Sequence, residues 1–189
     1  GEAADVHTTR MGIRTATLDR TSTTNANGDG QFRFIVNGKP IFCMGTNWVP
    51  VDSLHSRDAE RLPGILPMLT DINCNIIRIW GGGVYEDDQL YDFCDEQGIM
   101  IWQDFMMACS RYPNDRDFCE VMEQEAEAAV KWLRHHPSIV IWAGDNECDC
   151  TYQWSGTRRD PNSNILTREI LKQACEVHDY TRPYLPSSP

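Results

Sequence analysis

The stretch of sequence that decides the fold is residues 138–147, which read Ser-Ile-Val-Ile-Trp-Ala-Gly-Asp-Asn-Glu. Its first half is a short apolar run after Pro137, which is typical of a strand that is buried on both faces. The small residues that follow let the backbone turn, so Asn146 and Glu147 are expected at the carboxyl end of that strand. In parallel sheets and α/β barrels this edge holds the ligands and the catalytic groups. Glu147 is therefore a candidate proton donor, and a solvated loop carboxylate is the alternative interpretation.

The alternation of strand and helix extends outward from this stretch over most of the chain. The pattern predicts strands at 40–44, 75–80, 99–102, 138–142 and 182–186, and helices at 87–97, 117–134 and 167–177. Such alternation indicates a parallel sheet with right-handed crossovers. Five strands are more than half of an eight-stranded barrel. The predicted fold class is therefore α/β, an incomplete (β/α)8 barrel of the TIM type with a short β remnant at its N-terminus.

A further segment, residues 57–70, has apolar residues at helical spacing but contains two prolines. Pro63 fits the first turn of a helix, whereas Pro67 is expected to kink or break it. We predict a short or bent helix in this segment.

The polar, Thr-rich start of the chain differs from the rest. We expect residues 1–30 to be the end of a preceding β domain plus a linker, and residues 31–189 to be the N-terminal part of the barrel. Residues 31–36 alternate in polarity and Asn37-Gly38 predicts a hairpin turn. Because the chain begins with Gly1 and stops within the alternation, we expect a piece of a longer protein, with no compartment assigned.

The composition limits the partners and cofactors that we expect. A formal net charge of −11 without any basic run argues against nucleic acid or an anionic membrane surface. No apolar stretch is long enough to span a membrane. The eight cysteines show no Cys-x-x-Cys spacing, and the pair Cys148 and Cys150 has no second ligand pair nearby, so we predict no metal and no cofactor. The cysteines are expected to be buried free thiols that act as small hydrophobes.

Four predicted strand ends carry polar or aromatic groups that packing does not require. They are Asn47-Trp48, Trp80 with its glycines, Gln103-Asp104 and Asn146-Glu147. In a barrel all four would converge on one mouth. Aromatic faces beside carboxylates and amides suit a sugar, whose apolar C–H faces lie on Trp rings and whose hydroxyls form hydrogen bonds.

Other residues have more ordinary interpretations. Trp102 and Trp142 are expected in the core, and Arg78 is expected to be a buried partner that orients carboxylates such as Glu147. His135 and His136 precede a strand, so they are predicted at the opposite end of the barrel. The acids 86–88 are predicted to start a helix.

Five segments carry a family resemblance, and they follow one another in order over nearly the whole chain. They are residues 45–52, 77–88 with its Trp-Gly-Gly-Gly, 102–106, 134–138 and 182–189. Together they resemble the β-mannosidases of glycoside hydrolase family 2. The resemblance implies a catalytic TIM barrel in a retaining exo-β-mannosidase that releases terminal β-D-mannose. It also implies that residues 10–15 end the immunoglobulin-like sandwich that precedes this barrel.

The resemblance also implies roles for single residues. Glu147 matches the general acid/base, Asn146 the amide that holds the 2-hydroxyl, and Trp80 an aromatic wall. Asp104 is expected to reach sugar hydroxyls, Trp154 to be a further wall, and Asn47 to be another substrate-binding candidate.

The chain departs from the family pattern in two respects. Asp145 stands where the family usually has Asn, and it could raise the pKa of Glu147 by repulsion or face away. The nucleophilic carboxylate of the family lies on a later strand, beyond residue 189. We therefore expect the isolated chain to be inactive, to need the remainder of its polypeptide and to be prone to self-association.

Two groups of alternatives stay open at this stage. One is another activity of the same family, such as β-galactosidase or exo-β-glucosaminidase. The other is a sugar-binding module that keeps the aromatic walls without turnover.

Overall fold

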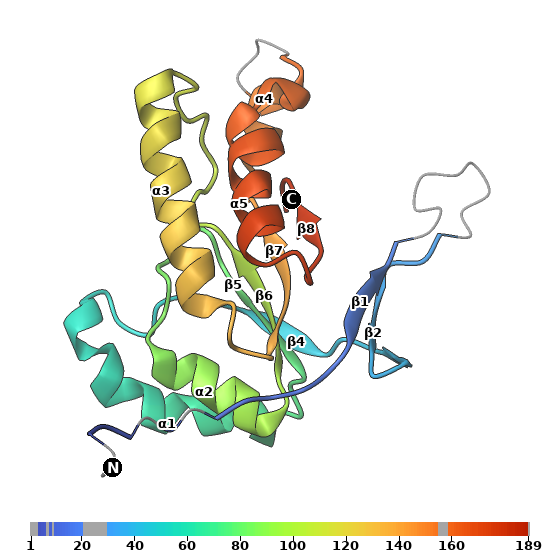
Figure 1. Ribbon diagram of the computed structural model, residues 1–189, viewed down its shortest axis with the longest axis vertical. Coiled ribbons are helices and arrows are strands. Elements are labelled where there is room, and N and C mark those ends of the chain that lie inside the picture. The colour runs from blue at the N-terminus through green and yellow to red at the C-terminus, as the bar shows by residue number, and fades with distance from the viewer. Residues whose placement is uncertain (1–3, 7, 9, 21–29, 155–158, 189) are drawn as a thin grey trace.

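The computed structural model describes residues 4–6, 8, 10–20, 30–154 and 159–188. Its main sheet has five parallel strands in chain order (Figure 1). They are β4 (Gly45–Trp48), β5 (Ile76–Ile79), β6 (Met100–Asp104), β7 (Ile139–Ala143) and β8 (Tyr184–Leu185). This sheet, with a helix between successive strands, confirms the predicted partial α/β barrel.

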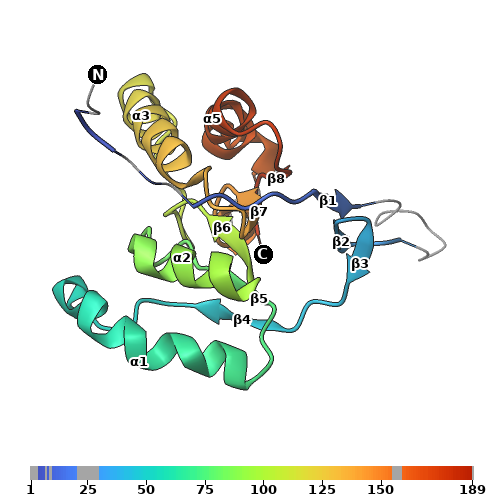
Figure 2. The ribbon, with the colours of Figure 1, turned by 60° about the horizontal axis from the view of Figure 1, so that its bottom comes forward.

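The helices lie on one side of the sheet, and the small N-terminal strands lie on the other (Figure 2). The helices are α1 (Asp58–Asp71), α2 (Asp88–Gln97), α3 (Arg116–Leu133), α4 (Cys148–Trp154) and α5 (Leu171–His178). Two 3-10 turns, η1 (His55–Arg57) and η2 (Pro161–Ser163), and a π-helical turn, η3 (Leu166–Ile170), complete the helical elements among the described residues.

Two helix starts show how the sequence sets the boundaries. In α2, the side chain of Asp87 accepts a hydrogen bond from the amide of Gln89, and Gly98 ends the helix at φ 70°, as predicted. In α3, the helix begins at Arg116, one residue before the predicted start at Asp117. Asp115 caps this helix by accepting from the amide of Phe118, and Asp117 lies in the first turn, where a carboxylate suits the helix dipole.

Of the two alternatives predicted for residues 57–70, a short or a bent helix, the short helix is wrong, and the bend stays a prediction. α1 runs for 14 residues with both prolines inside it. Leu62, Leu66 and Leu69 form a stripe that is buried in the core. Each proline removes one backbone hydrogen bond, and the packing of the leucine stripe outweighs that loss.

The first barrel strand begins later than predicted. The segment predicted as one strand at 40–44 contains the end of β3 (Lys39–Ile41) and the link to β4, which starts at Gly45. Asn47 and Trp48 therefore lie within a strand and not beyond its end. Asn47 stands beside Arg78 of β5 in the parallel register.

A second, antiparallel sheet joins β1 (Ala16–Asp19), β2 (Arg33–Val36) and β3. The hairpin between β2 and β3 turns at Asn37 and Gly38, both with positive φ, as the dipeptide predicted. β1 pairs with β2, so this sheet has strands on both sides of the expected division at residue 30. The domain division stays a prediction, and residues 21–29 of the expected linker lie outside the described residues.

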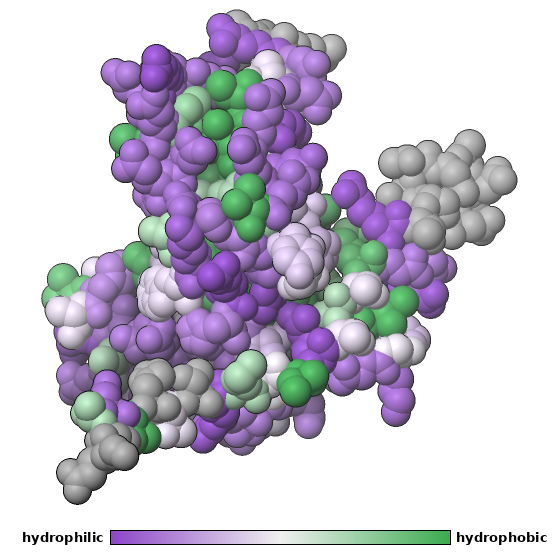
Figure 3. Space-filling model, in the orientation of Figure 1, coloured by the Kyte–Doolittle hydropathy of each residue, from purple (hydrophilic) through white to green (hydrophobic). Residues whose placement is uncertain are grey.

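The two faces of the main sheet are covered by two hydrophobic clusters. The larger cluster lies between the strands and the helices and includes the fully buried Trp142. The smaller cluster joins Phe34 and Ala16 of the small sheet to Val140 and Leu185 of the barrel strands. On the outside, hydrophobic residues show between α3 and α5, while hydrophilic residues cover most of α3 (Figure 3).

Trp102 differs from its predicted place in the core. It is half-buried, and alternation along β6 directs it to the same inner face as Met100 and Asp104. Its ring meets Phe34 edge-on, with 6.4 Å between the ring centroids. The inner face is therefore apolar toward the amino ends of the strands and becomes polar toward their carboxyl ends.

Candidate active site

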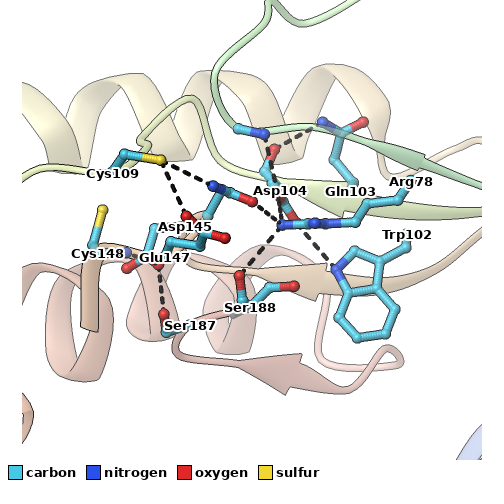
Figure 4. A network of polar contacts seen from close by, with 12 residues as sticks. Arg78, Trp102, Gln103, Asp104, Cys109, Asp145, Glu147, Cys148, Ser187 and Ser188 are labelled. Carbon is cyan, nitrogen blue, oxygen red and sulfur yellow. Dashed lines mark hydrogen bonds and ion pairs between the residues drawn. The ribbon is translucent and has the colours of Figure 1, made fainter. Parts of the chain in front are cut away.

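The segment after β7 is held on both sides by the neighbouring strand ends (Figure 4). The amide of Asn146 donates to the carbonyl of Met107 at 2.9 Å, and the amide of Glu147 donates to the carbonyl of Ser188 at 3.1 Å. Glu147 adopts φ 60°, which is uncommon for a residue with a side chain. This backbone places Asn146 and Glu147 at the carboxyl edge, where the sequence predicts them.

Glu147 and Asn146 differ in exposure and share one neighbour. Glu147 is half-buried, and Asn146 is 6% exposed. The thiol of Cys109 donates to Glu147 Oε2 at 3.4 Å, and Asn146 Nδ2 donates to the same sulfur at 3.3 Å. On its other side, Asn146 Oδ1 accepts from Arg78 Nη2 at 2.9 Å. The acid therefore has one open side, and its amide neighbour is fixed by hydrogen bonds.

Arg78 and Asp104 form the ion pair at the centre of the site. Arg78 Nε lies 3.2 Å from Asp104 Oδ1, and Arg78 Nη2 lies 2.6 Å from Asp104 Oδ2. The sequence predicted that Arg78 orients carboxylates such as Glu147. In the part of the chain that the structure describes, its hydrogen bonds go to Asp104, Asn146 and the carbonyl of Ser188, so Glu147 was the wrong example.

Asp104 is completely buried, and donors surround it. Besides Arg78, it accepts hydrogen bonds from the amide of Gly81 at 3.1 Å and from Trp102 Nε1 at 3.0 Å. Burial raises the pKa of Asp104 to about 6 in spite of these donors. Because a carboxylate has about four acceptor positions, this arrangement favours a role in holding Arg78. The direct contact between Asp104 and sugar hydroxyls stays a prediction.

Asp145 lies beneath the site, fully buried. Its Oδ1 accepts from Ser187 Oγ at 2.6 Å and from the amide of Cys148, the first residue of α4, at 3.1 Å. Burial raises its pKa to about 6. These contacts support the second of the two predicted alternatives for Asp145, namely that the side chain faces away from the opening.

Among the described residues, three predicted site residues lie apart from the hydrogen-bond network of Asn146 and Glu147. Trp80 is half-buried directly after β5, and its ring packs against Gly82, where an added Cβ would lie 2.1 Å from the ring. Asn47 is exposed on β4. Trp154 ends α4 and is 62% exposed. Their roles as sugar contacts stay predictions.

Hollows on the inner face flank Trp102. One, of about 560 Å³, is lined by Trp102, Arg168 and the residues 185–188. Another, of about 510 Å³, is lined by Asn47, Arg78 and Trp102. The aromatic ring thus separates two spaces on the face that carries the polar network.

Sequence analysis missed Gly81 and Cys109 as site residues. A Cβ at Gly81 would lie 2.6 Å from the carbonyl oxygen of Met107 and 3.3 Å from the amide of Asn146, so only glycine fits there. The Trp-Gly-Gly-Gly motif pointed to this turn without showing which glycine touches the site. No sequence pattern singled out Cys109, and all eight cysteines were predicted to be buried. That prediction is wrong for Cys109 and Cys43, which are exposed.

Glu86 also differs from its prediction as helix-start chemistry. Asp87 and Asp88 do start α2, but Glu86 is 2% exposed and accepts a hydrogen bond from Trp48 Nε1 at 3.0 Å. Burial raises the pKa of Glu86. This buried contact ties the loop after β5 to β4.

The amino ends of the same strands carry a second set of polar groups. His136 Nδ1 lies 2.7 Å from Asp95, whose other oxygen accepts from the amide of Ser138. As predicted, the histidines lie before β7, at the end opposite Glu147. Asp92, Asp95 and His136 form the one group of three potential metal ligands in the described ranges, with ligand atoms within 4.8 Å. His136 already uses Nδ1 for Asp95, and the group carries no metal assignment.

A parallel strand-and-helix barrel with an acid and an amide at its carboxyl edge places the chain in the class of TIM-barrel domains. Comparison with known proteins then gives the family. The chain belongs to the glycosyl hydrolases of family 2, whose TIM barrel domain matches residues 29–184. This confirms the resemblance that the sequence motifs indicated.

The chain is similar to β-mannosidases in sequence. It is 41% identical to "Beta-mannosidase" of Bos taurus over 167 residues, which cover 84% of this chain and 19% of the bovine protein. It is 42% identical to "Beta-mannosidase B" of Emericella nidulans over 196 residues, covering 95% of this chain and 23% of that protein. The chain therefore spans about a fifth of the length of these curated relatives.

Solved structures agree with this placement. The crystal structure of a β-D-mannosidase from Dictyoglomus thermophilum matches with a TM-score of 0.86 at 40% identity, covering 95% of this chain and 22% of that one. A β-glucuronidase from Parabacteroides merdae matches with a TM-score of 0.71 at 20% identity, which shows the shared fold alone. Within the described residues, none of the helices is both long and apolar enough to cross a membrane.

Proposed function

We propose that the protein containing this chain is a retaining β-mannosidase that releases terminal β-D-mannose, with Glu147 as its acid/base. The observation that carries the proposal is the pair Asn146–Glu147 at the carboxyl edge of β7, in a chain about 40% identical to β-mannosidases. The left-handed backbone at Glu147 supports it, because strained conformations gather at functional sites.

The mechanism that we propose is double displacement. Glu147 protonates the glycosidic oxygen while a second carboxylate attacks the anomeric carbon, and Glu147 then acts as a base on the incoming water. We infer from the family resemblance that the second carboxylate belongs to a later strand. The half-buried position of Glu147 suits both steps, since one side is open to a ligand.

Asn146 is proposed to hold the 2-hydroxyl of the sugar. Arg78 fixes its Oδ1, and one hydrogen of Nδ2 is directed to the sulfur of Cys109. The amide nitrogen carries two hydrogens, so one remains to donate to a sugar hydroxyl. Asp104 supports this arrangement because it holds the guanidinium of Arg78 in a two-point ion pair.

Trp80 is proposed as an aromatic wall of the same site. The turn 80–83 places it next to Gly81, whose amide donates to Asp104. The packing of Gly82 against its ring leaves the indole orientation fixed before any ligand arrives. A fixed aromatic face suits the apolar side of a pyranose.

The test is a panel of aryl glycosides assayed with the full-length parent protein. We expect release of the phenol from the β-mannoside with retention of anomeric configuration. Faster turnover of a β-galactoside or β-glucosaminide would assign another activity of the family. Binding of mannose without release of any aglycone would identify a sugar-binding module and overturn the proposal.

A further inference from the structure

We propose that Cys109 is a positioning residue for Glu147, acting through a thiol hydrogen bond that joins the acid to its neighbouring amide. This proposal rests on the proposed function, because it assigns Cys109 to the proton-transfer step. The sulfur lies 3.4 Å from Glu147 Oε2 and 3.3 Å from Asn146 Nδ2, so it donates to one and accepts from the other.

The backbone places Cys109 there through a ladder of hydrogen bonds between two loops. The amide of Phe105 donates to the carbonyl of Ala143, the amide of Asn146 donates to that of Met107, and the amide of Cys109 donates to that of Asn146. Their lengths are 2.8, 2.9 and 2.8 Å. The loop after β6 thus continues the pairing of β6 with β7 as far as the acid itself.

A second anchor holds the same loop from the side of α3. The amide of Ala108 donates to the hydroxyl of Tyr112 at 2.9 Å. The ring of Tyr112 stacks on Phe118 of α3, with 6.2 Å between the centroids. The position of Cys109 is therefore fixed by the protein and does not depend on its own contact with Glu147.

The conformation of Cys109 is costly for a residue with a side chain. It adopts φ 49°, and Glu147 opposite it adopts φ 60°. Left-handed conformations at residues other than glycine are strained and persist only where the surroundings impose them. Here the two strained residues turn their side chains toward each other (Figure 4).

The thiol is in the form that donates. Local desolvation of the sulfur and the hydrogen bond to Glu147 both raise the pKa of Cys109 above its ordinary value, although the residue is exposed, so it carries its proton at neutral pH. A thiol is a weak donor, which orients a carboxylate without competing strongly for the proton that the carboxylate must transfer. Capping the sulfur would remove the donor and place bulk against Glu147.

The test compares leaving groups in the full-length parent. We expect Cys109→Ala to lower kcat/KM by about 3- to 10-fold on a β-mannoside with a poor leaving group, the scale of one lost hydrogen bond. On a dinitrophenyl β-mannoside, which needs little protonation, the loss should stay below about 2-fold. Cys109→Ser keeps a donor and an acceptor and should restore most of the activity. Cys43→Ala, which removes the other exposed thiol, should change neither rate.

Several outcomes would overturn the proposal. Equal losses on both leaving groups would show a general structural role, and unchanged rates would show no role. If Cys109→Ala does not fold, treatment of the wild type with a methanethiosulfonate supplies the second measurement. Full modification of Cys109, seen by mass spectrometry, with unchanged activity would then contradict the role.

The same experiment separates this proposal from the proposed function. If the parent cleaves another aryl glycoside instead of the mannoside, β-mannosidase activity fails, and the leaving-group comparison on the cleaved sugar still decides the role of Cys109. If no glycoside is cleaved at all, both proposals are wrong.

Discussion

The acids at the two ends of the same five strands differ in burial and in hydrogen bonding. At the amino end, Asp179 accepts hydrogen bonds from Trp142 Nε1 and Thr181 Oγ1 and pairs with Arg182, and both charged side chains of this pair are buried. At the carboxyl end, Glu147 is half-exposed and receives one weak donor from a side chain. The first arrangement stabilises the fold, whereas the second leaves an acid available.

The backbone of β6 and β7 shows the same difference. Among the described residues, Gly98 is the one with positive φ just before these two strands, although Asn73 before β5 also adopts φ 55°. Cys109 and Glu147, at the carboxyl ends, both have positive φ. The comparison teaches that one sheet can keep its stability and its reactivity at separate edges, a division that is general in α/β barrels.

Replacing Glu147 should give the largest effect, and it should change the activity without changing the stability. In the full-length parent, Glu147→Gln should slow hydrolysis of natural β-mannosides by about 10²- to 10⁴-fold, the usual contribution of a general acid. Substrates with very acidic phenols should lose much less in the first step. Steady-state and single-turnover rates on both substrate types measure this, and equal losses would remove Glu147 from the role.

Replacing Asp179, the buried acid at the amino end, should lower the stability and leave the activity unchanged. Asp179→Ala leaves Arg182 buried without its carboxylate and should cost roughly 3–5 kcal/mol in the free energy of unfolding. The specific activity of the folded fraction should not change. Thermal unfolding of the parent measures the loss, with Arg116→Ala as a control, since its exposed pair with Glu120 is worth well under 1 kcal/mol. Equal effects of the two variants would contradict the comparison.

Asp145, a buried acid at the carboxyl end, should make the stability of the protein depend on pH. Because burial raises its pKa from 3.8 to about 6, the folded state holds this proton longer than the unfolded state does. The contribution to stability is therefore full below about pH 4 and is lost as pH rises through about 6, by up to about 3 kcal/mol. Asp145→Asn should flatten this part of the pH–stability curve.

The measurement is the apparent melting temperature of the parent at several values between pH 4 and 8. Some slope should remain in the variant, because burial also raises the pKa of Asp104 to about 6. An unchanged slope in Asp145→Asn would show that Asp145 ionises normally in the folded protein.

The aromatic wall gives the smallest expected effect. Trp80→Ala in the parent should cost roughly 1–3 kcal/mol of transition-state stabilisation, the scale of one lost ring contact. The loss should follow contact area, so Trp80→Phe should recover part of it. Values of kcat/KM for an aryl β-mannoside test this, and an unchanged value for Trp80→Ala would place the indole outside the sugar site.

The strand-and-helix alternation was predictable because it depends on local patterns. The buried strand 139–143 and the caps of α2 follow from residues close together in sequence. The partner of Arg78 was not predictable in this way, because Asn146 lies 68 positions away and meets it only through the register of three strands. The same holds for Cys109, which reaches Glu147 only because its loop continues the strand pairing.

The length of α1 was missed for a different physical reason. Proline rules describe a helix in isolation, whereas α1 is stabilised by the core against which its leucines pack. Propensity therefore gave the wrong length where tertiary packing was stronger. It gave the right boundary at Gly98, where a left-handed residue is needed whatever the packing.

The small sheet under the barrel has a consequence for the order of folding. Ala16 and Phe34 share their hydrophobic cluster with Val140 and Leu185, which are synthesised more than a hundred residues after Phe34. Met100 and Trp102 cover only part of the apolar face of the small sheet, so the cover is incomplete until β7 and β8 are made. Contacts of such long sequence separation form slowly, because the loop entropy is lost before the contacts are gained. Until then, this apolar face is exposed hydrophobic surface of the kind that chaperones bind during synthesis.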